Sequence, residues 1–349
     1  MVDMEYHSKI HKIIFVGSIH GKFSKLFKKI HKINQEHGPF EAMICPGRVF
    51  GVNNEEWQLI LSGQLICPIP LFILGPQNSQ DQDYYQNNPS PSLAGLIAPN
   101  IYCLGSNGIY VTSSDIQIAF ISLSCLPDGS WGIHPENVNY ITEYLKNSTN
   151  FKGVDFLISP VWPAKVVNYV NPTEIPKQFI SENGEINVNF GDETISKLAS
   201  VLQPRYHICQ FDSDESIYYQ RPPYRNHGNL QTFQKPHHLT HFVSVGAFEN
   251  SQKFKDTYAV KISPITQMCY SDLCIAPPDT TQNPYPKYMS IIESNQSHSA
   301  LNKKSLAGLQ NKSASLTVSD CWFCLDNPKI QLHMIFYISQ FVFFYKRIH

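Results

Sequence analysis

The chain has 349 residues and a mass of 39.7 kDa, which is enough for one large domain or two modest ones. Its 27 lysines and arginines nearly balance 28 acidic residues, giving a formal net charge of −1. This balance argues against a protein that binds nucleic acid over its whole surface, but it allows a local basic patch. Apolar residues make up 42% of the chain, too many for an intrinsically disordered protein. We therefore expect a folded, soluble protein.

The compartment can be judged from the first residues and from the cysteines. The apolar run at residues 13–16 is too short for a secretory signal. Nine cysteines are scattered along the chain, and several of them, such as Cys45 and Cys103, lie in apolar, strand-like runs. Such cysteines favour reduced, buried thiols, so we expect the cytosol or the nucleus.

Three apolar runs in the first hundred residues end in loops that contain glycine. Residues 12–16 lead into Gly17-Ser18-Ile19-His20-Gly21, residues 42–45 into Pro46-Gly47-Arg48, and residues 71–74 into Gly75-Pro76-Gln77. Between the first two runs, apolar residues recur at helical spacing from residue 23 to residue 33, with lysines on the opposite face. The runs predict buried strands of an α/β sheet, whose strand ends are where such sheets hold ligands.

Further elements follow in chain order. We expect antiparallel strands at residues 101–104, 109–112 and 116–123, a helix from Pro135 to Lys146, and a buried strand at residues 154–158. Later elements are a helix at residues 193–202, a short strand near Tyr206, and strands at residues 239–245 and 257–262. This pattern predicts an α/β sandwich of two mixed sheets flanked by helices.

The composition changes after Ile275, which we take as the end of a first domain, residues 1–275. Residues 276–319 combine prolines with a polar, serine-rich run and offer too little apolar area to offset the entropy of ordering, which predicts a linker. Residues 320–349 begin with Cys321-Trp-Phe-Cys324-Leu and end in an apolar, aromatic run. That run, residues 334–345, is too short for a membrane span and is more typical of an aggregation-prone segment.

The strand-end loops resemble the metal-binding motifs of the calcineurin-like metallophosphoesterases, and among them the RNA lariat debranching enzymes. In that family two metal ions clamp the attacking and leaving oxygens of a phosphodiester. Ser18 stands here where the first motif has its carboxylate, although His20 of that motif is retained. Arg48 follows Gly47 where the family has an aspartate. The resemblance implies a metallophosphoesterase-like sandwich that has lost metal ligands.

The remaining motifs depart from the family in the same way. Gly75-Pro76-Gln77-Asn78 stands where the family has Gly-Asn-His-Glu, and Pro160 stands in the place of a ligand histidine. His207 lies in a segment like the last motif, but no His-x-His follows it. Because two like unit charges about 4 Å apart repel by about 4 kcal/mol at an effective dielectric of about 20, Arg48 opposes a divalent cation. We therefore expect no bound metal, no cofactor and no catalysis.

Two of these residues have alternative interpretations. His20 is either a remnant of a metal or phosphate contact or an ordinary hydrogen-bonded histidine at a strand-to-helix turn. Arg48 either binds a phosphate in the vacated site, which suits its planar guanidinium, or forms a structural ion pair.

Several separate motifs, in order, resemble the CwfJ family of spliceosome-associated proteins, also called Cwf-nineteen-like. They lie at residues 151–163, 204–207, 218–227, 277–285 and 321–325. The N-terminal domain of that family looks like a debranching enzyme without metal ligands, and its later domains resemble histidine-triad hydrolases. The resemblance implies a nuclear location, with the debranching enzyme and late spliceosomal proteins as partners. By the same resemblance, residues 320–349 are the truncated start of the histidine-triad-like region.

Residues 218–227 interleave arginines with tyrosines, which provide cations for phosphates and planes for bases. The alternative is a loop whose tyrosines cover the core and whose arginines pair with acidic residues nearby. The candidate contacts to RNA or to a protein partner are Arg205, Tyr218, Tyr219, Arg221, Tyr224, Arg225 and His227. Cys321 and Cys324 have the spacing of half a zinc site, but a structural site needs four ligands.

The sequence therefore predicts a non-catalytic scaffold, or an activator of the lariat debranching enzyme, in mRNA splicing and intron turnover. One alternative is an active metal-dependent phosphodiesterase with a remodelled site. The other is a simple RNA-binding module that contacts intron RNA directly. In each case we expect the chain to have no membrane partner.

Overall fold

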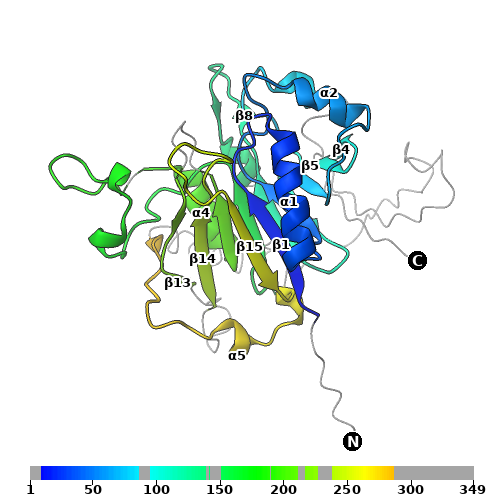
Figure 1. Cartoon of the computed structure of the whole chain (residues 1–349). Helices are drawn as coiled ribbons and strands as arrows, with labels where there is room; N and C mark the ends of the chain where they lie inside the picture. Colours follow the sequence, from blue (N-terminus) through cyan, green and yellow to red (C-terminus); the bar gives the residue numbers. More distant parts are fainter. Residues whose placement is uncertain are drawn as a thin grey trace, which may run out of the picture. The chain divides into compact units, whose positions relative to one another are not determined.

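Two sheets form the core of the compact unit that ends at Tyr285 (Figure 1). The computed structural model describes residues 9–85, 95–138, 141, 151–188, 190–210, 217–226 and 238–286. The first sheet has the strand order β15-β1-β2-β3-β5-β4, and the second has the order β12-β14-β11-β10-β7-β6, with β13 paired to β14. Both sheets mix parallel and antiparallel pairs. This arrangement confirms the predicted fold class.

The strands of the first sheet are β1 (His11–Val16), β2 (Ala42–Cys45), β3 (Leu71–Ile73), β4 (Gly95–Ala98), β5 (Ile101–Cys103) and β15 (Thr257–Ile262). Those of the second are β6 (Asn107–Val111), β7 (Gln117–Ile121), β10 (Phe156–Ser159), β11 (Tyr206–Cys209), β12 (Tyr219–Gln220), β13 (Tyr224–Arg225) and β14 (Leu239–Ser244). A small hairpin joins β8 (Ser124–Cys125) and β9 (Trp131–Gly132). The helices are α1 (Phe23–His37), α2 (Glu55–Leu61), α4 (Glu193–Leu202) and α5 (Tyr270–Leu273).

Alternation along β1 shows how the layers are built. Successive side chains of a strand point to opposite faces of its sheet. Ile13 and Phe15 face the second sheet, where the Phe15 ring lies 5.1 Å from the ring of Phe156. Ile14 and Val16 face the other way and pack in the cluster that contains the apolar side of α1. Because both faces of β1 are covered, apolar residues are favoured at every position, and this gives the continuous apolar run seen in the sequence.

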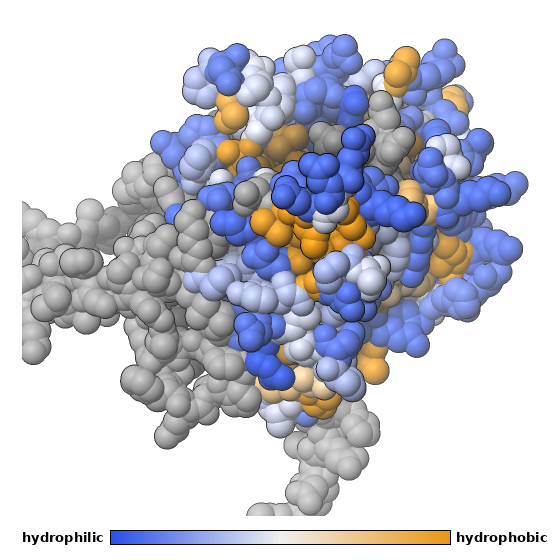
Figure 2. All heavy atoms as spheres, turned by 90° about the vertical axis from the view of Figure 1, so that its left-hand side faces the viewer, coloured by the Kyte–Doolittle hydropathy of each residue, from blue (hydrophilic) through white to orange (hydrophobic). Residues whose placement is uncertain are grey.

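The outer face of the second sheet is covered by α4 and by residues 161–188. Trp162 is 1% exposed, and its ring stacks 5.3 Å from Tyr219 and contacts Phe179 and Phe242. The indole Nε1 donates a hydrogen bond to Ser244 Oγ at 2.9 Å. On the side of the molecule seen in Figure 2, hydrophobic side chains gather near the middle of the view and hydrophilic ones surround them.

The pairing of β5 differs from the prediction. We predicted that residues 101–104 join an antiparallel set with the next two strands, but only β6 and β7 form an antiparallel hairpin. Strand β5 instead pairs in parallel with β3 and antiparallel with β4 in the first sheet. The chain crosses to the second sheet at Gly105, whose φ of 95° favours glycine. A short apolar run does not reveal which strand it will pair with, which explains the error.

The described part of the chain continues past residue 275. The backbone N–H of Thr281 donates to the carbonyl of Pro223 at 2.8 Å, and the N–H of Arg225 donates to the carbonyl of Thr281 at 3.1 Å. Tyr285 is fully buried. The first compact unit accordingly runs to Tyr285, so residues 277–285 belong to it and not to the linker. The rest of the predicted linker and residues 320–349 lie outside the described residues.

Two other predictions are limited by the described range. Residues 135–138 are helical, as expected from Pro135, but most of the predicted continuation to Lys146 lies outside it. No helix in the part of the chain that the structure describes is long and apolar enough to cross a membrane.

His207 lies in the interior of the second sheet, on β11. Its Nε2 is 2.8 Å from the hydroxyl of Ser159 on the parallel strand β10, and its ring meets Phe242 edge-on at 5.4 Å. Nδ1 is buried without a hydrogen-bond partner among the described residues. Because burial penalises the charged imidazolium, the pKa of His207 is lowered to about 3.

We predict that His207 makes the folded state less stable in acid. Between its ordinary pKa of 6.5 and its folded pKa of about 3, the unfolded chain takes up a proton on His207 and the folded chain does not. Stability therefore falls as the pH falls through this window, by about 1.4 kcal/mol per pH unit from this residue. Urea denaturation across the window should show a smaller slope for His207→Gln. The same change at the exposed His37 serves as the control, and equal slopes in all three proteins would contradict the prediction.

Candidate functional site

The loops that follow β1 and β2 meet the end of β11 at the carboxyl edge of the sheets, and Ser18 lies at the meeting point. Its backbone N–H donates to Gln210 Oε1 at 2.9 Å, and its hydroxyl oxygen accepts the N–H of Arg48 at 2.9 Å. Its carbonyl accepts the N–H of Phe248, also at 2.9 Å. Ser18 and Gln210 are both almost completely buried. The polar groups at this point are thus engaged with one another.

Packing around this network is tight. A Cβ atom added to Gly47 would lie 2.3 Å from Ser18 Oγ and 2.7 Å from Gln210 Oε1. A Cβ on Gly17 would lie 1.8 Å from the carbonyl oxygen of Gly246. Both glycines are therefore required by the close approach of neighbouring loops. At these two positions there is no room for a larger residue.

His20 follows the network in a left-handed backbone conformation, with a φ of 51°. The N–H of the preceding Ile19 donates to the carbonyl of Arg48 at 2.7 Å, which ties this turn to the loop after β2. Within the described ranges, no group of three or more histidine, cysteine, aspartate or glutamate side chains could hold a metal ion. His20 is half-buried and is the one imidazole that the first motif contributes.

Arg48 faces a carboxylate that the sequence analysis did not include. Its Nη2 lies 3.8 Å from Oδ1 of Asp81, whose side chain is 6% exposed, whereas the Arg48 side chain is 34% exposed. Burial raises the pKa of Asp81, and the Arg48 charge acts in the opposite direction. Of the two alternatives for Arg48, the geometry supports the structural ion pair. No pattern marked Asp81, which lies in a polar loop far from Arg48 in the sequence.

Gln77 and Asn78 hold loops together. The amide nitrogen of Gln77 donates to the carbonyl of Pro46 at 3.3 Å, and the side-chain oxygen of Asn78 accepts the N–H of Asp81 at 2.9 Å. Pro160 is buried and offers no ligand atom. The structure thus brings Ser18, Arg48 and Gln77 to neighbouring loops. It leaves His207 out, because that ring hydrogen bonds inside the second sheet.

The side chains at these strand ends do not suit the two-metal centre of the calcineurin-like metallophosphoesterases. Divalent cations of this class are held by carboxylates and imidazoles, several to each ion. Here the groups at the strand ends are a hydroxyl and amides that already have protein partners, together with a guanidinium. Gln210, which the sequence analysis missed, occupies the end of β11, where the strand-end rule would have pointed to it.

Three of the predicted RNA contacts are buried. Tyr219 is 7% exposed, Arg221 is 2% exposed and Tyr224 is not exposed. The Arg221 guanidinium donates to Thr281 Oγ1 at 2.5 Å and to the carbonyl of Val166, and it lies 5.0 Å from the centre of the Tyr224 ring. The prediction that these three side chains form an exposed surface is therefore wrong. Interleaved tyrosines and arginines can satisfy each other in the interior as well as bind a ligand.

The other predicted contacts are in different situations. Arg205 is held by Asp155, 3.1 Å away, and by the carbonyl of Ser263 at 2.6 Å. Tyr218 and Arg225 are partly exposed. His227, Cys321 and Cys324 lie outside the described residues.

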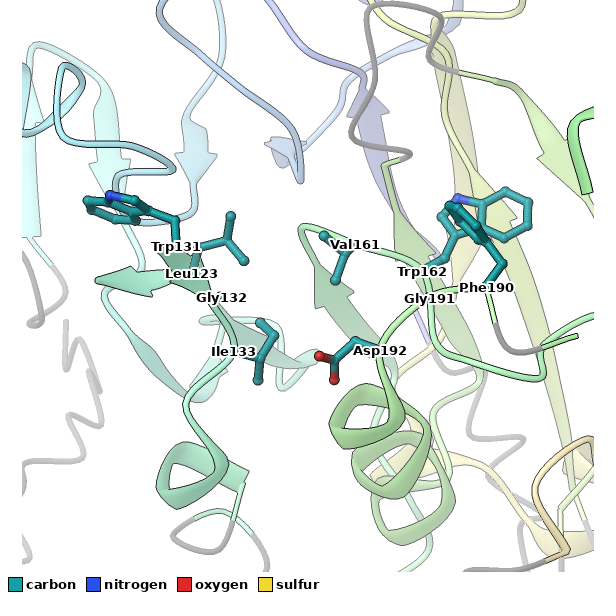
Figure 3. A pocket seen from close by; sticks show the side chains of 9 residues that line it. All are labelled: Leu123, Trp131, Gly132, Ile133, Val161, Trp162, Phe190, Gly191 and Asp192. Atoms are coloured by element: carbon teal, nitrogen blue, oxygen red, sulfur yellow. The ribbon is translucent and has the colours of Figure 1, made fainter. Parts of the chain in front are cut away.

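A separate hollow of about 350 Å³ lies beyond the ends of β7 and β10 (Figure 3). The hairpin β8–β9 forms one side, and Val161 and the start of α4 form the other. Among the described residues that line it, Asp192 has the only carboxylate, and its Oδ1 accepts the N–H groups of Thr194 and Ile195 at the helix start. The hollow is otherwise mostly apolar, and its one carboxylate is engaged by backbone N–H groups at the start of α4.

Comparisons with known proteins agree with the sequence motifs. No family model matches the chain. Curated proteins called CWF19-like protein 1 from Pongo abelii and Homo sapiens are each 31% identical to it over 355 residues, covering 93% of this chain. The chain spans 62% of the length of these relatives.

A solved structure, TT1561 of Thermus thermophilus, aligns with 68% of this chain and 90% of its own, at 10% identity and a TM-score of 0.41. That similarity carries no conclusion about function. The similarity to CWF19-like protein 1 is stronger evidence, because it is 31% identity over 93% of this chain. The similarity of this chain to CWF19-like protein 1 confirms the resemblance to the Cwf-nineteen-like family.

Proposed function

We propose that this chain is a non-catalytic scaffold that works with late spliceosomal proteins in the nucleus and activates the RNA lariat debranching enzyme. The observation that supports the non-catalytic part is the closed network of Ser18, Gln210 and the Arg48 backbone at the strand ends. The partners are proposed from the family resemblance, which is an argument by association and not from geometry.

The charges at the strand ends support the same proposal. The Arg48 guanidinium repels a nearby divalent cation by about 4 kcal/mol for each unit of the cation's charge at about 4 Å and an effective dielectric of about 20. Asp81 offsets part of this repulsion, but its carboxylate faces Arg48 at 3.8 Å. The pair has no net charge, so it provides little attraction for a metal ion. Hydrolysis of a phosphodiester by the two-metal mechanism needs both cations in place, so we do not expect that reaction at these strand ends.

The first prediction concerns metal binding. We expect no saturable binding of Mn²⁺ to the purified chain in isothermal titration, and no Mn²⁺-dependent hydrolysis of bis(para-nitrophenyl) phosphate. The reason is that the first motif retains a single imidazole, His20, and one such ligand cannot hold a divalent ion.

Two variants make this test decisive. His20→Ala removes the retained imidazole, and His31→Ala removes an exposed histidine of α1 as the matched control. Stoichiometric Mn²⁺ binding that is lost in His20→Ala and kept in His31→Ala would contradict the proposal. It would favour the alternative of a metal-dependent phosphodiesterase with a remodelled site.

The second prediction concerns the debranching enzyme. A scaffold that holds enzyme and substrate together raises their effective concentration. We therefore expect an equimolar amount of this chain to raise the initial rate of lariat cleavage at subsaturating substrate by about fivefold, the lower end of typical coupling between two sites. The chain with a catalytically inactive debranching enzyme is the control.

A pull-down from nuclear extract with the full chain as bait provides the second measurement. Recovery of the debranching enzyme together with late spliceosomal proteins is the expected result. An unchanged cleavage rate together with recovery of neither would refute the proposed partners.

A further inference from the structure

Positive charge is concentrated in two segments of this chain. Residues 9–37 and 249–262 together contain ten lysines and only three acidic residues, although the whole chain has a net charge of −1. The remainder of the chain is correspondingly acidic. A local excess of this size is an electrostatic feature that the overall composition hides.

The two segments lie side by side in the fold. Strand β15 pairs antiparallel with β1, from Val16 opposite Thr257 to His11 opposite Ile262. The loop before β15 is tied to α1 by ion pairs of Lys25 with Glu249 at 3.0 Å and of Lys29 with Asp256. Figure 1 shows α1 lying in front of β1, with β15 next to that strand. The lysines of both segments therefore lie close together, on α1 and around the sheet edge formed by β15, and we call this surface the lysine face.

Helix α1 directs its lysines outward because its other side is buried. Phe23, Leu26, Phe27 and Ile30 pack into the core, which leaves the opposite side of the helix to polar residues. The side chains of Lys25 and Lys32 are 67% and 76% exposed, and Lys28 is also exposed. These three positions, spaced by three and four residues, form one stripe along the helix.

The carboxylates of this face are already in use. Glu249, Asp256 and Glu36 each lie within 4.0 Å of a lysine on α1. Glu56, which accepts the N–H of Ser24, and Glu41, which pairs with His11, also adjoin it. Five carboxylates still cannot neutralise ten lysines, so the face keeps an excess of positive charge. A polyanion would be attracted to it, and its counterions would be released on binding.

Two aromatic rings lie at the sheet edge on the other side of β15 from α1, between the two sheets. The Lys255 ammonium is 5.2 Å from the ring centre of Tyr218 and 5.1 Å from that of Tyr258. Both rings are partly buried and pack against the cluster between the two sheets. Lys255 is exposed, and its side chain can move aside. Cations that follow a backbone, together with rings on which bases stack, are the combination used to bind single-stranded nucleic acid.

We propose that α1, the loop at residues 249–256 and β15 form a lysine face that binds single-stranded RNA. Its lysines contact phosphates, and Tyr218 and Tyr258 stack on bases at its edge. An acidic peptide would use the lysines but would gain nothing from the ring planes, so the observations favour RNA. The inference goes beyond the proposed scaffold role and rests on charge and geometry alone. RNA binding by this face can therefore be refuted while activation of the debranching enzyme is confirmed. Activation can likewise be refuted while RNA binding is confirmed.

The test measures binding of a fluorescent oligouridine of about 16 nucleotides to the full chain by anisotropy, over a range of salt concentrations. Lys25→Gln/Lys28→Gln should weaken binding by about tenfold at about 100 mM salt and lower the slope of log K against log salt by about 0.7 per lost contact. The matched control is Lys177→Gln/Lys197→Gln, which removes the same charge elsewhere and should bind like the wild type.

A second pair of variants tests the rings. Tyr218→Ala should weaken binding by about fivefold or more, the lower end of what one stacked base contributes. Tyr218→Phe keeps the ring and should bind like the wild type.

Four results would overturn the inference. One is no binding by the wild-type chain at about 100 mM salt. The second is an equal loss in both lysine pairs, and the third is full binding by Tyr218→Ala. The last is polyglutamate that competes as well as unlabelled oligouridine, which would assign the face to an acidic peptide.

Discussion

One hydrogen bond joins the two sheets where a catalytic centre would have to be. Ser18 follows β1 of the first sheet, Gln210 follows β11 of the second, and the Ser18 N–H donates to the Gln210 amide at 2.9 Å. With Arg48 bound to the Ser18 hydroxyl, three strand ends are fixed to one another. Metal ligands in this place would need free lone pairs directed into a shared space. Here the Gln210 amide oxygen and the Ser18 hydroxyl oxygen each accept a backbone N–H, so these two groups hold the strand ends together.

Much of the fold follows from local patterns. The apolar periods predicted β1 and α1 closely, and the predicted bounds of α4 agree with those observed, because the aspartate at its N-cap and the apolar face both mark the helix. Pairing was harder. Nothing within residues 101–104 indicates that β5 joins β3 rather than β6, since strand order is set by long-range packing. The burial of Tyr285 was hidden for the same reason: its pocket is formed by residues far away in the sequence.

The candidate site shows the same division between local and distant information. Strand-end loops located Ser18 and Arg48, because parallel strands bring their carboxyl ends to one edge. Asp81 was missed, since only the fold brings it to Arg48. Arg221 and Tyr224 were predicted to be exposed, but they are buried. A mixture of arginine and tyrosine indicates which interactions are possible and does not indicate whether the side chains face solvent or the interior. Strands of two residues, such as β12 and β13, are too short for alternation to reveal which face is buried.

Metal binding and RNA binding respond differently to substitution. A two-metal centre needs several ligands at once, so replacing a few of them removes the activity entirely. The free energy of binding to phosphates is the sum of many weak contacts. The loss of one lysine therefore removes only the contribution of that contact. The proposed lysine face on α1 and β15 therefore does not depend on metal ligands at the strand ends. The two properties are separable, because binding of RNA phosphates by lysines requires no metal-dependent chemistry.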